Sequence, residues 1–258
     1  MRYIDIEPLV FFHIVRHAAA VDYGGGTRNP VFSLTPEGDV EAEQVAEKIL
    51  DLLGPGVLLT LQSSNTNRTL ETARAILALY RPPQKPKLEE ALREVDNFDF
   101  RFFGPVVLGG NVRHSETGDV FNINTKLTNP RRLSPVDYYR KTEWQRLNRS
   151  LQEKVPSWLF GLMEQIESPR SVNERMFSHL KNVSGQEFSR DQTHHVVMVT
   201  HQAPTFHLVE RATSGATTIG LRTGGILSMQ RISEDNLVPI GITGISTKKI
   251  KTGLNLLG

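Results

Sequence analysis

The stretch Phe11-Phe12-His13-Ile14-Val15-Arg16-His17-Ala18 decides the fold of this chain. Residues 10–15 are almost entirely apolar and rich in β-branched and aromatic side chains, which is typical of a strand buried on both faces, although a buried helix segment can have the same composition. The stretch ends on Arg16 and His17, a cation beside an imidazole. Because ligands bind at the carboxyl ends of strands in parallel α/β sheets, the pair either lines a ligand site or marks where a core strand reaches water.

Two strand–helix units can be read from the first part of the chain. Thr35 and Pro36 are a typical N-cap and first helical residue, and an amphipathic stripe follows over residues 45–53. Residues 57–61 form a second apolar run, and a second helix begins close to Arg68. Strands and helices that alternate with short connections predict βαβ units and hence a parallel sheet.

A third unit lies near the end of the chain. Residues 195–200 form another apolar run that ends on His201, and a helix is predicted from Pro204 to about residue 211. Two more strands are predicted over residues 226–232 and 238–245. Taken together, residues 1–258 predict a single domain with a three-layer α/β/α architecture and a mainly parallel central sheet.

Between the second and third units lies a long region, residues 95–185, with little periodicity at its start and many Phe, Gly, Asn and Arg residues. Long irregular connections in compact domains are usually functional loops or disorder, and the aromatic content here favours an ordered lid. Helices are predicted over residues 137–153 and 172–183. We therefore expect residues 95–185 to form a helical and loop cap, an insertion over the edge of the sheet that carries the site.

The composition excludes several classes of protein. The chain has 258 residues, a net charge of +2 and no cysteine, which excludes a thiolate nucleophile, a disulfide scaffold and cysteine-based zinc sites. Neither nucleic acid nor a membrane is an expected partner, because there is no strongly charged patch and no apolar segment of about 20 residues. The N-terminal residues do not resemble a signal peptide, so we expect a cytoplasmic protein. The oligomeric state is left open.

Charged and imidazole side chains follow all three predicted parallel strands. Arg16 and His17 end the first strand, Arg68 lies in the first helical turn after the second, and His201 ends the third. These ends meet at one edge of a parallel sheet, and the start of a helix favours anions. Arginine pairs bidentately with phosphate or carboxylate oxygens, and imidazole can act as nucleophile, base or charge stabiliser. The pattern predicts a site for an oxyanion, most naturally a phosphoryl group.

Five motifs in the same order resemble one known family. They are Val15-Arg16-His17 for an Arg-His-Gly motif, Leu34-Thr35-Pro36-Glu37-Gly38 for Leu-Thr-x-x-Gly, Ser63-Ser64 followed by Arg68-Thr69 and Thr72-Ala73, Leu92-x-Glu94, and Val199-Thr200-His201. The chain thereby resembles the histidine phosphatase superfamily, the phosphoglycerate-mutase-like clan, across roughly its whole length. The resemblance implies a phosphoglycerate-mutase-like fold.

The resemblance also implies a role for each matching residue. His17 would be the nucleophile that forms a phosphohistidine, while Arg16, Arg68 and His201 would hold the phosphoryl oxygens and stabilise the charge developing on them. Glu94 would protonate the leaving oxygen and later activate water. No metal and no cofactor are implied. The expected activity is that of a metal-independent phosphatase that hydrolyses a small phosphate monoester, and the expected partner is an anionic small molecule.

The sequence departs from the family pattern beside both histidines. Ala18 stands where the family has glycine, Ala19 and Ala20 replace residues that are usually polar, and Gln202 replaces a small residue. Glycine would let the backbone approach a phosphate closely, and polar neighbours would add hydrogen bonds to it. Two alternatives therefore stay open: an enzyme of the same fold that performs acid–base chemistry on another anionic small molecule without phosphoryl transfer, and a non-catalytic anion-binding module. A mutase is less favoured than a phosphatase.

Overall fold

The chain divides into two compact units. The first comprises Met1–Val21, Pro30–Glu94 and Asn173–Gly258, and the second comprises Asp22–Asn29 and Val95–Val172. The computed structural model describes residues 8–21, 33–54, 57–80, 85–94, 111–113, 120–122, 169–213, 220–244, 250 and 253–257.

Only a small part of the second unit is described. It contains the short antiparallel pair β4 (Asn111–Arg113) and β5 (Val120–Asn122), in which Val112 pairs with Phe121. The helix predicted over residues 137–153 lies outside the described residues. The placement of a cap over the site therefore stays a prediction.

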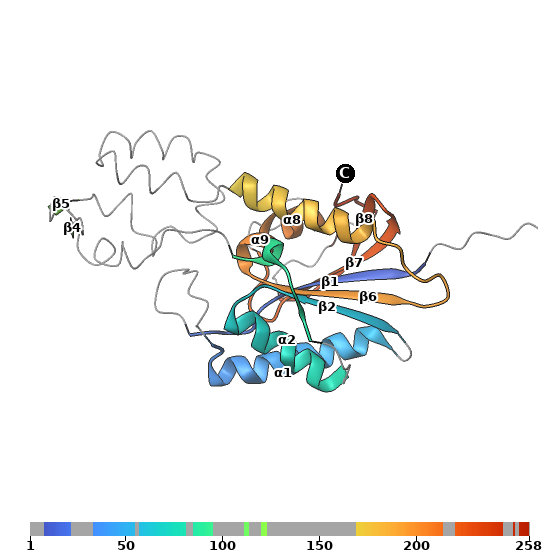
Figure 1. Ribbon diagram of the computed structural model, residues 1–258, viewed down its shortest axis with the longest axis horizontal. Helices are drawn as coiled ribbons and strands as arrows, with labels where there is room; N and C mark the ends of the chain where they lie inside the picture. Colours follow the sequence, from blue (N-terminus) through green and yellow to red (C-terminus); the bar gives the residue numbers. More distant parts are fainter. Residues whose placement is uncertain are drawn as a thin grey trace, which may run out of the picture. The chain divides into compact units, whose positions relative to one another are not determined.

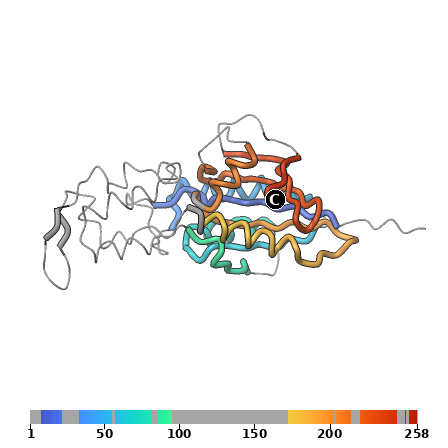
Figure 2. Tube along the Cα trace, turned by 90° about the horizontal axis from the view of Figure 1, so that it is seen from above, coloured from blue at the N-terminus to red at the C-terminus, as the bar shows by residue number. Residues whose placement is uncertain are grey.

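The first unit is built on a six-stranded sheet. Its strand order is β3-β2-β6-β1-β7-β8, and Figure 2 shows β7 and β8 in red along one side, β2 in cyan towards the other, and β1 between them. Adjacent strands from β3 to β1 run parallel, whereas β7 and β8 are antiparallel to their neighbours. The prediction of a mainly parallel sheet is confirmed. The strands are β1 (Val10–Arg16), β2 (Leu58–Ser63), β3 (Lys87–Leu88), β6 (His194–Thr200), β7 (Ile226–Ser233) and β8 (Asn236–Ile242).

Helices cover both faces of this sheet. Figure 1 shows α1 (Pro36–Leu53) and α2 (Asn67–Tyr80) on one face, and α8 (Pro169–Ser184) and α9 (Gln202–Ala212) on the other. Successive residues of β1 serve the two layers, because side chains alternate along a strand. Ile14 belongs to the core cluster that includes α8 and α9, and Val15 to the cluster that includes α1 and α2. The three-layer α/β/α architecture is confirmed.

Helix α8 belongs to the sheet unit from Asn173 onwards. Its buried Met176 and Leu180 pack in the same core cluster as Phe12 of β1. From the sequence alone, both residues belong to the end of the expected insertion over residues 95–185. The structure shows instead that most of the helix over residues 172–183 is a layer of the core, because its apolar residues recur on one side at helical spacing. Among the described residues, no helix is long and apolar enough to cross a membrane.

The start of α1 is fixed by close packing against the segment that follows β1. Thr35 is the N-cap, and its side chain accepts a hydrogen bond from the Gly38 amide. A Cβ atom placed on Gly38 would lie 1.8 Å from the carbonyl oxygen of Ala19. No side chain fits there, so glycine at this position lets the backbone after His17 lie directly on the helix.

The strand register brings the three parallel strand ends into one row. Arg16 of β1 pairs with Thr200 of β6, and Ser63 of β2 pairs with Val199 of β6. The ladder continues one step beyond the strands, because the His17 amide donates to the Thr200 carbonyl over 2.9 Å. Residues that immediately follow β1, β2 and β6 therefore emerge at the same edge of the sheet.

Candidate active site

His17 lies directly after β1 and is buried. Its Nδ1 lies 2.7 Å from the carbonyl oxygen of Ala18. A carbonyl oxygen can only accept, so Nδ1 carries the proton and the lone pair is on Nε2. Burial, followed by the positive charges of Arg68 and Arg16, lowers the pKa of His17 to about 3. The ring is therefore neutral near pH 7, with a nucleophilic nitrogen.

The segment after His17 is held by side chains from the two helices on that face. The Ala18 amide donates to Oγ1 of Thr72 over 3.1 Å, and the Ala19 amide donates to the Glu41 carboxylate over 2.6 Å. The other carboxylate oxygen of Glu41 accepts from the Thr223 hydroxyl over 3.0 Å. Thr72 belongs to a motif quoted above, but Glu41 was missed, because a glutamate in an amphipathic helix is usually solvated.

His201 follows β6 and is fully buried, with one polar partner at each ring nitrogen. An arginine can only donate, so the 3.3 Å contact from Arg68 Nη2 makes His201 Nδ1 an acceptor. The proton therefore resides on Nε2, which donates to the Ser64 hydroxyl over 3.0 Å. Burial lowers the pKa of His201 well below its usual range, and the neighbouring His17 ring and Arg68 guanidinium lower it further. The rings of His17 and His201 meet edge to face with centroids 5.1 Å apart.

The two arginines supply the fixed positive charge of this cluster. Arg68 is buried in the first turn of α2. Arg16 donates from Nη1 to the carbonyl oxygen of Leu221 over 2.8 Å, and its buried Nε has no hydrogen-bond partner within the described part of the chain. Burial lowers the pKa of both guanidinium groups. Arginine nevertheless stays protonated in proteins, so both groups remain cations.

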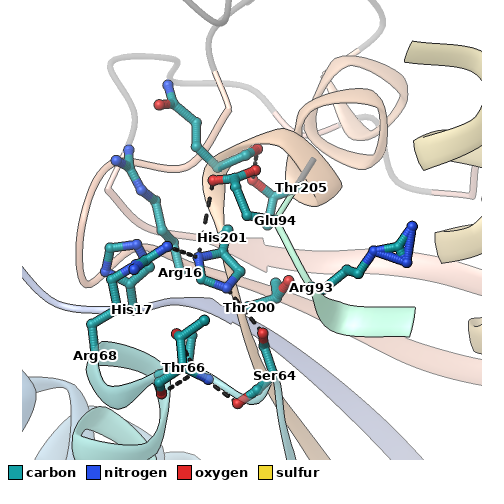
Figure 3. A network of polar contacts seen from close by, with 12 residues as sticks. Arg16, His17, Ser64, Thr66, Arg68, Arg93, Glu94, Thr200, His201 and Thr205 are labelled. Atoms are coloured by element: carbon teal, nitrogen blue, oxygen red, sulfur yellow. Dashed lines mark hydrogen bonds and ion pairs between the residues drawn. The ribbon is translucent and has the colours of Figure 1, made fainter. Parts of the chain in front are cut away.

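Glu94 follows the short 3-10 helix η1 (Glu90–Leu92). Its Oε2 lies 3.9 Å from Nδ1 of His201, and Figure 3 shows its carboxylate above the His201 ring, near Arg16. The side chain is 17% exposed. The charge of Glu94 raises the pKa values of Arg16 and Arg68 and thereby offsets part of the effect of burial.

The structure thus brings together all five residues selected from the sequence. Two guanidinium groups, two neutral imidazoles and one carboxylate lie at one sheet edge, which gives the cluster a net positive charge and a preference for anions. No group of three or more His, Asp or Glu side chains suited to a metal ion occurs within the described ranges. The five residues are Arg16, His17, Arg68, Glu94 and His201.

Comparison with known proteins gives one family match. A family model, the histidine phosphatase superfamily (branch 1), matches residues 12–101, the segment that carries four of the five site residues. His201 lies beyond the matched segment. The family model thus confirms the resemblance to the histidine phosphatase superfamily over this segment of the chain. No curated protein matches the sequence significantly.

Solved structures with the same fold span most of the chain. A phosphoglycerate mutase from Bacillus anthracis has a TM-score of 0.59 at 17% identity and covers 91% of this chain and 92% of its own. A mutant phosphoserine phosphatase from Entamoeba histolytica, bound to phosphoserine, has a TM-score of 0.52 at 17% identity, with coverage of 90% and 96%. A mycobacterial glucosyl-3-phosphoglycerate phosphatase bound to VO3 has a TM-score of 0.50 at 15% identity, with coverage of 86% and 96%. At these identities the likeness establishes a phosphoglycerate-mutase-like fold.

A second buried histidine cluster lies inside the sheet. His13 of β1 contacts Ser228 of β7 through Nδ1 and His195 of β6 through Nε2, each over 2.9 Å. Burial, with a smaller contribution from His195, lowers the pKa of His13 to about 4, and burial likewise lowers the pKa of His195 to about 4. His13 is therefore a hydrogen-bonded core residue, and it is uncharged near pH 7.

This cluster should make the fold sensitive to acid. The pKa of His13 falls from 6.5 in the unfolded chain to about 4 in the folded protein. The unfolded state therefore binds more protons between these values, and stability is lost as the pH falls through that window. For His13 alone the loss corresponds to about 3 kcal/mol. Urea denaturation at a series of pH values across the window measures it.

A substitution separates this contribution from general acid effects. His13→Gln keeps a polar side chain that cannot titrate, so its free energy of unfolding should fall less steeply with acid than that of the wild type. Equal slopes for His13→Gln and the wild type would contradict the prediction.

Proposed function

We propose that this protein is a phosphatase that hydrolyses a small phosphate monoester through a phosphohistidine on His17. The observation that carries the proposal is the state of His17: a buried imidazole with its lone pair on Nε2, kept neutral beside two arginines. A neutral imidazole is a nucleophile, and two guanidinium groups attract the phosphoryl group that it would attack. The confirmed family resemblance supports the same reaction class.

Substrate binding would depend first on Arg16 and Arg68. Their planar guanidinium groups donate in pairs to phosphate oxygens, and the buried Nε of Arg16 provides one such donor. His201 has its Nδ1 engaged by Arg68 and its Nε2 engaged by Ser64. To contact a phosphoryl oxygen it must gain a proton on Nδ1, and the negative charge of a bound phosphate favours that protonated form.

The chemical steps use groups already in place. For the first step Glu94 must be in its carboxylic acid form, having taken up a proton as the substrate binds. Nε2 of His17 would then attack phosphorus while the ester P–O bond breaks and Glu94 gives that proton to the departing oxygen. Glu94, now a carboxylate, would then take a proton from water as the water oxygen attacks the phosphohistidine. Cleavage of the P–N bond would release phosphate and return the lone pair to His17. The two arginines would stabilise the charge on the equatorial oxygens in both steps.

One observation favours a second candidate, an enzyme of this fold that acts on another anion without phosphoryl transfer. The residues after His17 are Ala18, Ala19 and Ala20, which offer no polar side chain, and the amides of Ala18 and Ala19 are engaged by Thr72 and Glu41. A bound anion would then rely on the arginines. This candidate uses Glu94 and His17 as acid and base and forms no covalent intermediate.

The two candidates differ in a measurable product. We expect the wild-type protein to release inorganic phosphate from members of a panel of phosphate monoesters, with or without a chelator. A radiolabelled ester, quenched within one turnover, should leave label on the protein that is lost in acid and kept in base, because acid protonates the nitrogen of a P–N bond. If the protein releases no phosphate from any ester of the panel, the proposed function is contradicted. Turnover of a non-phosphate anion would support the alternative.

A further inference from the structure

The main chain that leads into Glu94 is held by side chains at three successive carbonyl groups. Arg175 of α8 donates from Nη1 to the carbonyl oxygen of Ala91 and, over 3.2 Å, to that of Arg93. Between them, the Leu92 carbonyl accepts from the Thr200 hydroxyl over 2.6 Å. These donors come from two different elements, α8 and β6, so the turn before Glu94 is fixed from two sides.

The elements that carry these donors are themselves well anchored. Arg175 precedes Met176, which is buried in the core cluster of the sheet, and Leu180 is buried one turn further along. Thr200 is fully buried at the end of β6, immediately before His201. Thr200 is hydrogen-bonded to Leu92 and immediately precedes His201, so the position of Glu94 is fixed relative to His201.

The site gives this positioning a chemical consequence. Glu94 has its Oε2 3.9 Å from Nδ1 of His201, and the Arg93 side chain points away from His201 in Figure 3. A proton donor must lie within hydrogen-bond reach of the departing oxygen, and a displacement of about 1 Å can cost about 100-fold in rate. A turn that loosens would remove Glu94 from that position while leaving the arginines of the anion site in place.

We propose that Arg175 is a positioning residue for Glu94, through its two hydrogen bonds to the carbonyl groups of the preceding turn. The inference rests on the proposed function, in which Glu94 protonates the leaving group. Nothing in the sequence motifs marks Arg175, since a lone arginine in an amphipathic helix is usually solvated. A merely structural role is the competing explanation, and the experiment must separate the two.

The test uses a series of substituted phenyl phosphates whose phenols differ in acidity. Loss of the proton donor slows esters with basic leaving groups and hardly affects p-nitrophenyl phosphate, whose leaving group needs no proton. Glu94→Gln should therefore lose about 100-fold on phenyl phosphate. Arg175→Ala should reproduce this selective pattern, with a loss of about 10- to 100-fold on phenyl phosphate and little change on p-nitrophenyl phosphate.

Further variants test the route through Glu94. The double variant Glu94→Gln with Arg175→Ala should be no slower on phenyl phosphate than Glu94→Gln alone, because the positioned group is already lost. Arg175→Lys should restore part of the rate, since an ammonium group can reach a carbonyl but lacks the fork. Thr200→Val keeps the shape of the side chain, removes the bond to Leu92, and should show the same selective loss even if Arg175→Ala folds poorly.

Arg211 provides the matched control. It is a half-buried arginine of α9 that donates from Nη2 to the main-chain carbonyl of Asn255 over 3.0 Å. Arg211→Ala should change the rate equally on all esters, if at all. Binding of vanadate should be nearly unchanged in Arg175→Ala.

The outcomes separate this inference from the function on which it rests. A wild-type protein that hydrolyses none of the phenyl phosphates overturns the proposed function and the positioning role with it. A wild-type protein that is active, with Arg175→Ala slowing all esters equally or none of them, overturns only the positioning role. The positioning role would also be overturned if the rate loss of the double variant on phenyl phosphate equalled the product of the two single losses. Arg175 would then act independently of Glu94.

Discussion

Replacement of His17 by alanine is expected to abolish turnover of phosphate esters. The nucleophile of the proposed reaction is the Nε2 lone pair of His17, which the bond from Nδ1 to the Ala18 carbonyl leaves free. His201 is not placed to replace it, because both of its ring nitrogens are engaged. We expect the rate to fall on the order of 10⁶-fold, the scale on which a hydrolase responds to loss of its nucleophile. Steady-state release of phosphate measures the loss.

Two further measurements decide what that loss means. His17→Ala should carry no acid-labile label after a quenched turnover, yet it should still bind vanadate, because Arg16 and Arg68 remain. His179→Ala is the matched control, since His179 is a half-buried histidine of α8 bound to Gln62 and takes no part in the site. It should keep both turnover and label. Wild-type turnover in His17→Ala would show that the phosphohistidine mechanism is wrong and would favour the acid–base alternative.

Replacement of Arg68 should give the second largest effect. Its buried guanidinium donates to His201 and supplies one of the two fixed charges of the anion site. Arg68→Ala should lower the rate about 10²- to 10³-fold, the cost of removing one donor to the developing charge. It should also weaken vanadate binding, measured by inhibition or calorimetry. The rate and the vanadate affinity of Arg68→Lys should lie between those of the wild type and of Arg68→Ala. Lysine keeps the positive charge, but a point charge cannot reproduce a bidentate fork.

Arg74 gives a control on the same helix. It is exposed on α2, six residues after Arg68, and it has no role in the site. Arg74→Ala should leave both vanadate affinity and rate nearly unchanged. Should Arg68→Ala bind vanadate as tightly as the wild type, the anion site would have to lie elsewhere on the protein.

Much of the fold could be predicted from the sequence, because its determinants are local. The apolar run that ends at Val15 has the length and composition of a buried strand, and Thr35 with Pro36 sets the start of α1 through a cap that needs only neighbouring residues. Element boundaries were predicted less well: α9 begins at Gln202 rather than at Pro204, because His201 already takes the extended N-cap conformation. Local propensity alone does not show at which residue a strand ends and the following helix begins.

The sequence also selected the five site residues, since each follows a strand end or lies in a family motif. Tertiary structure alone decided how they act. The tautomer of His201 depends on an arginine contributed by another segment, and that of His17 on the placement of its ring against the carbonyl group of Ala18. The low pKa of His17 depends on burial, which no local pattern reveals.

The residues that support the site were also beyond the reach of the sequence. Glu41 holds the Ala19 amide, and Arg175 holds the turn before Glu94, from positions far away along the chain. Each is an ordinary charged residue of an amphipathic helix, a pattern that fits a solvated side chain equally well. The sequence determines which residues can do the chemistry, and the strand ends and motifs identify them. Which charged side chains turn inwards to orient them depends on long-range packing, and only the folded chain decides it.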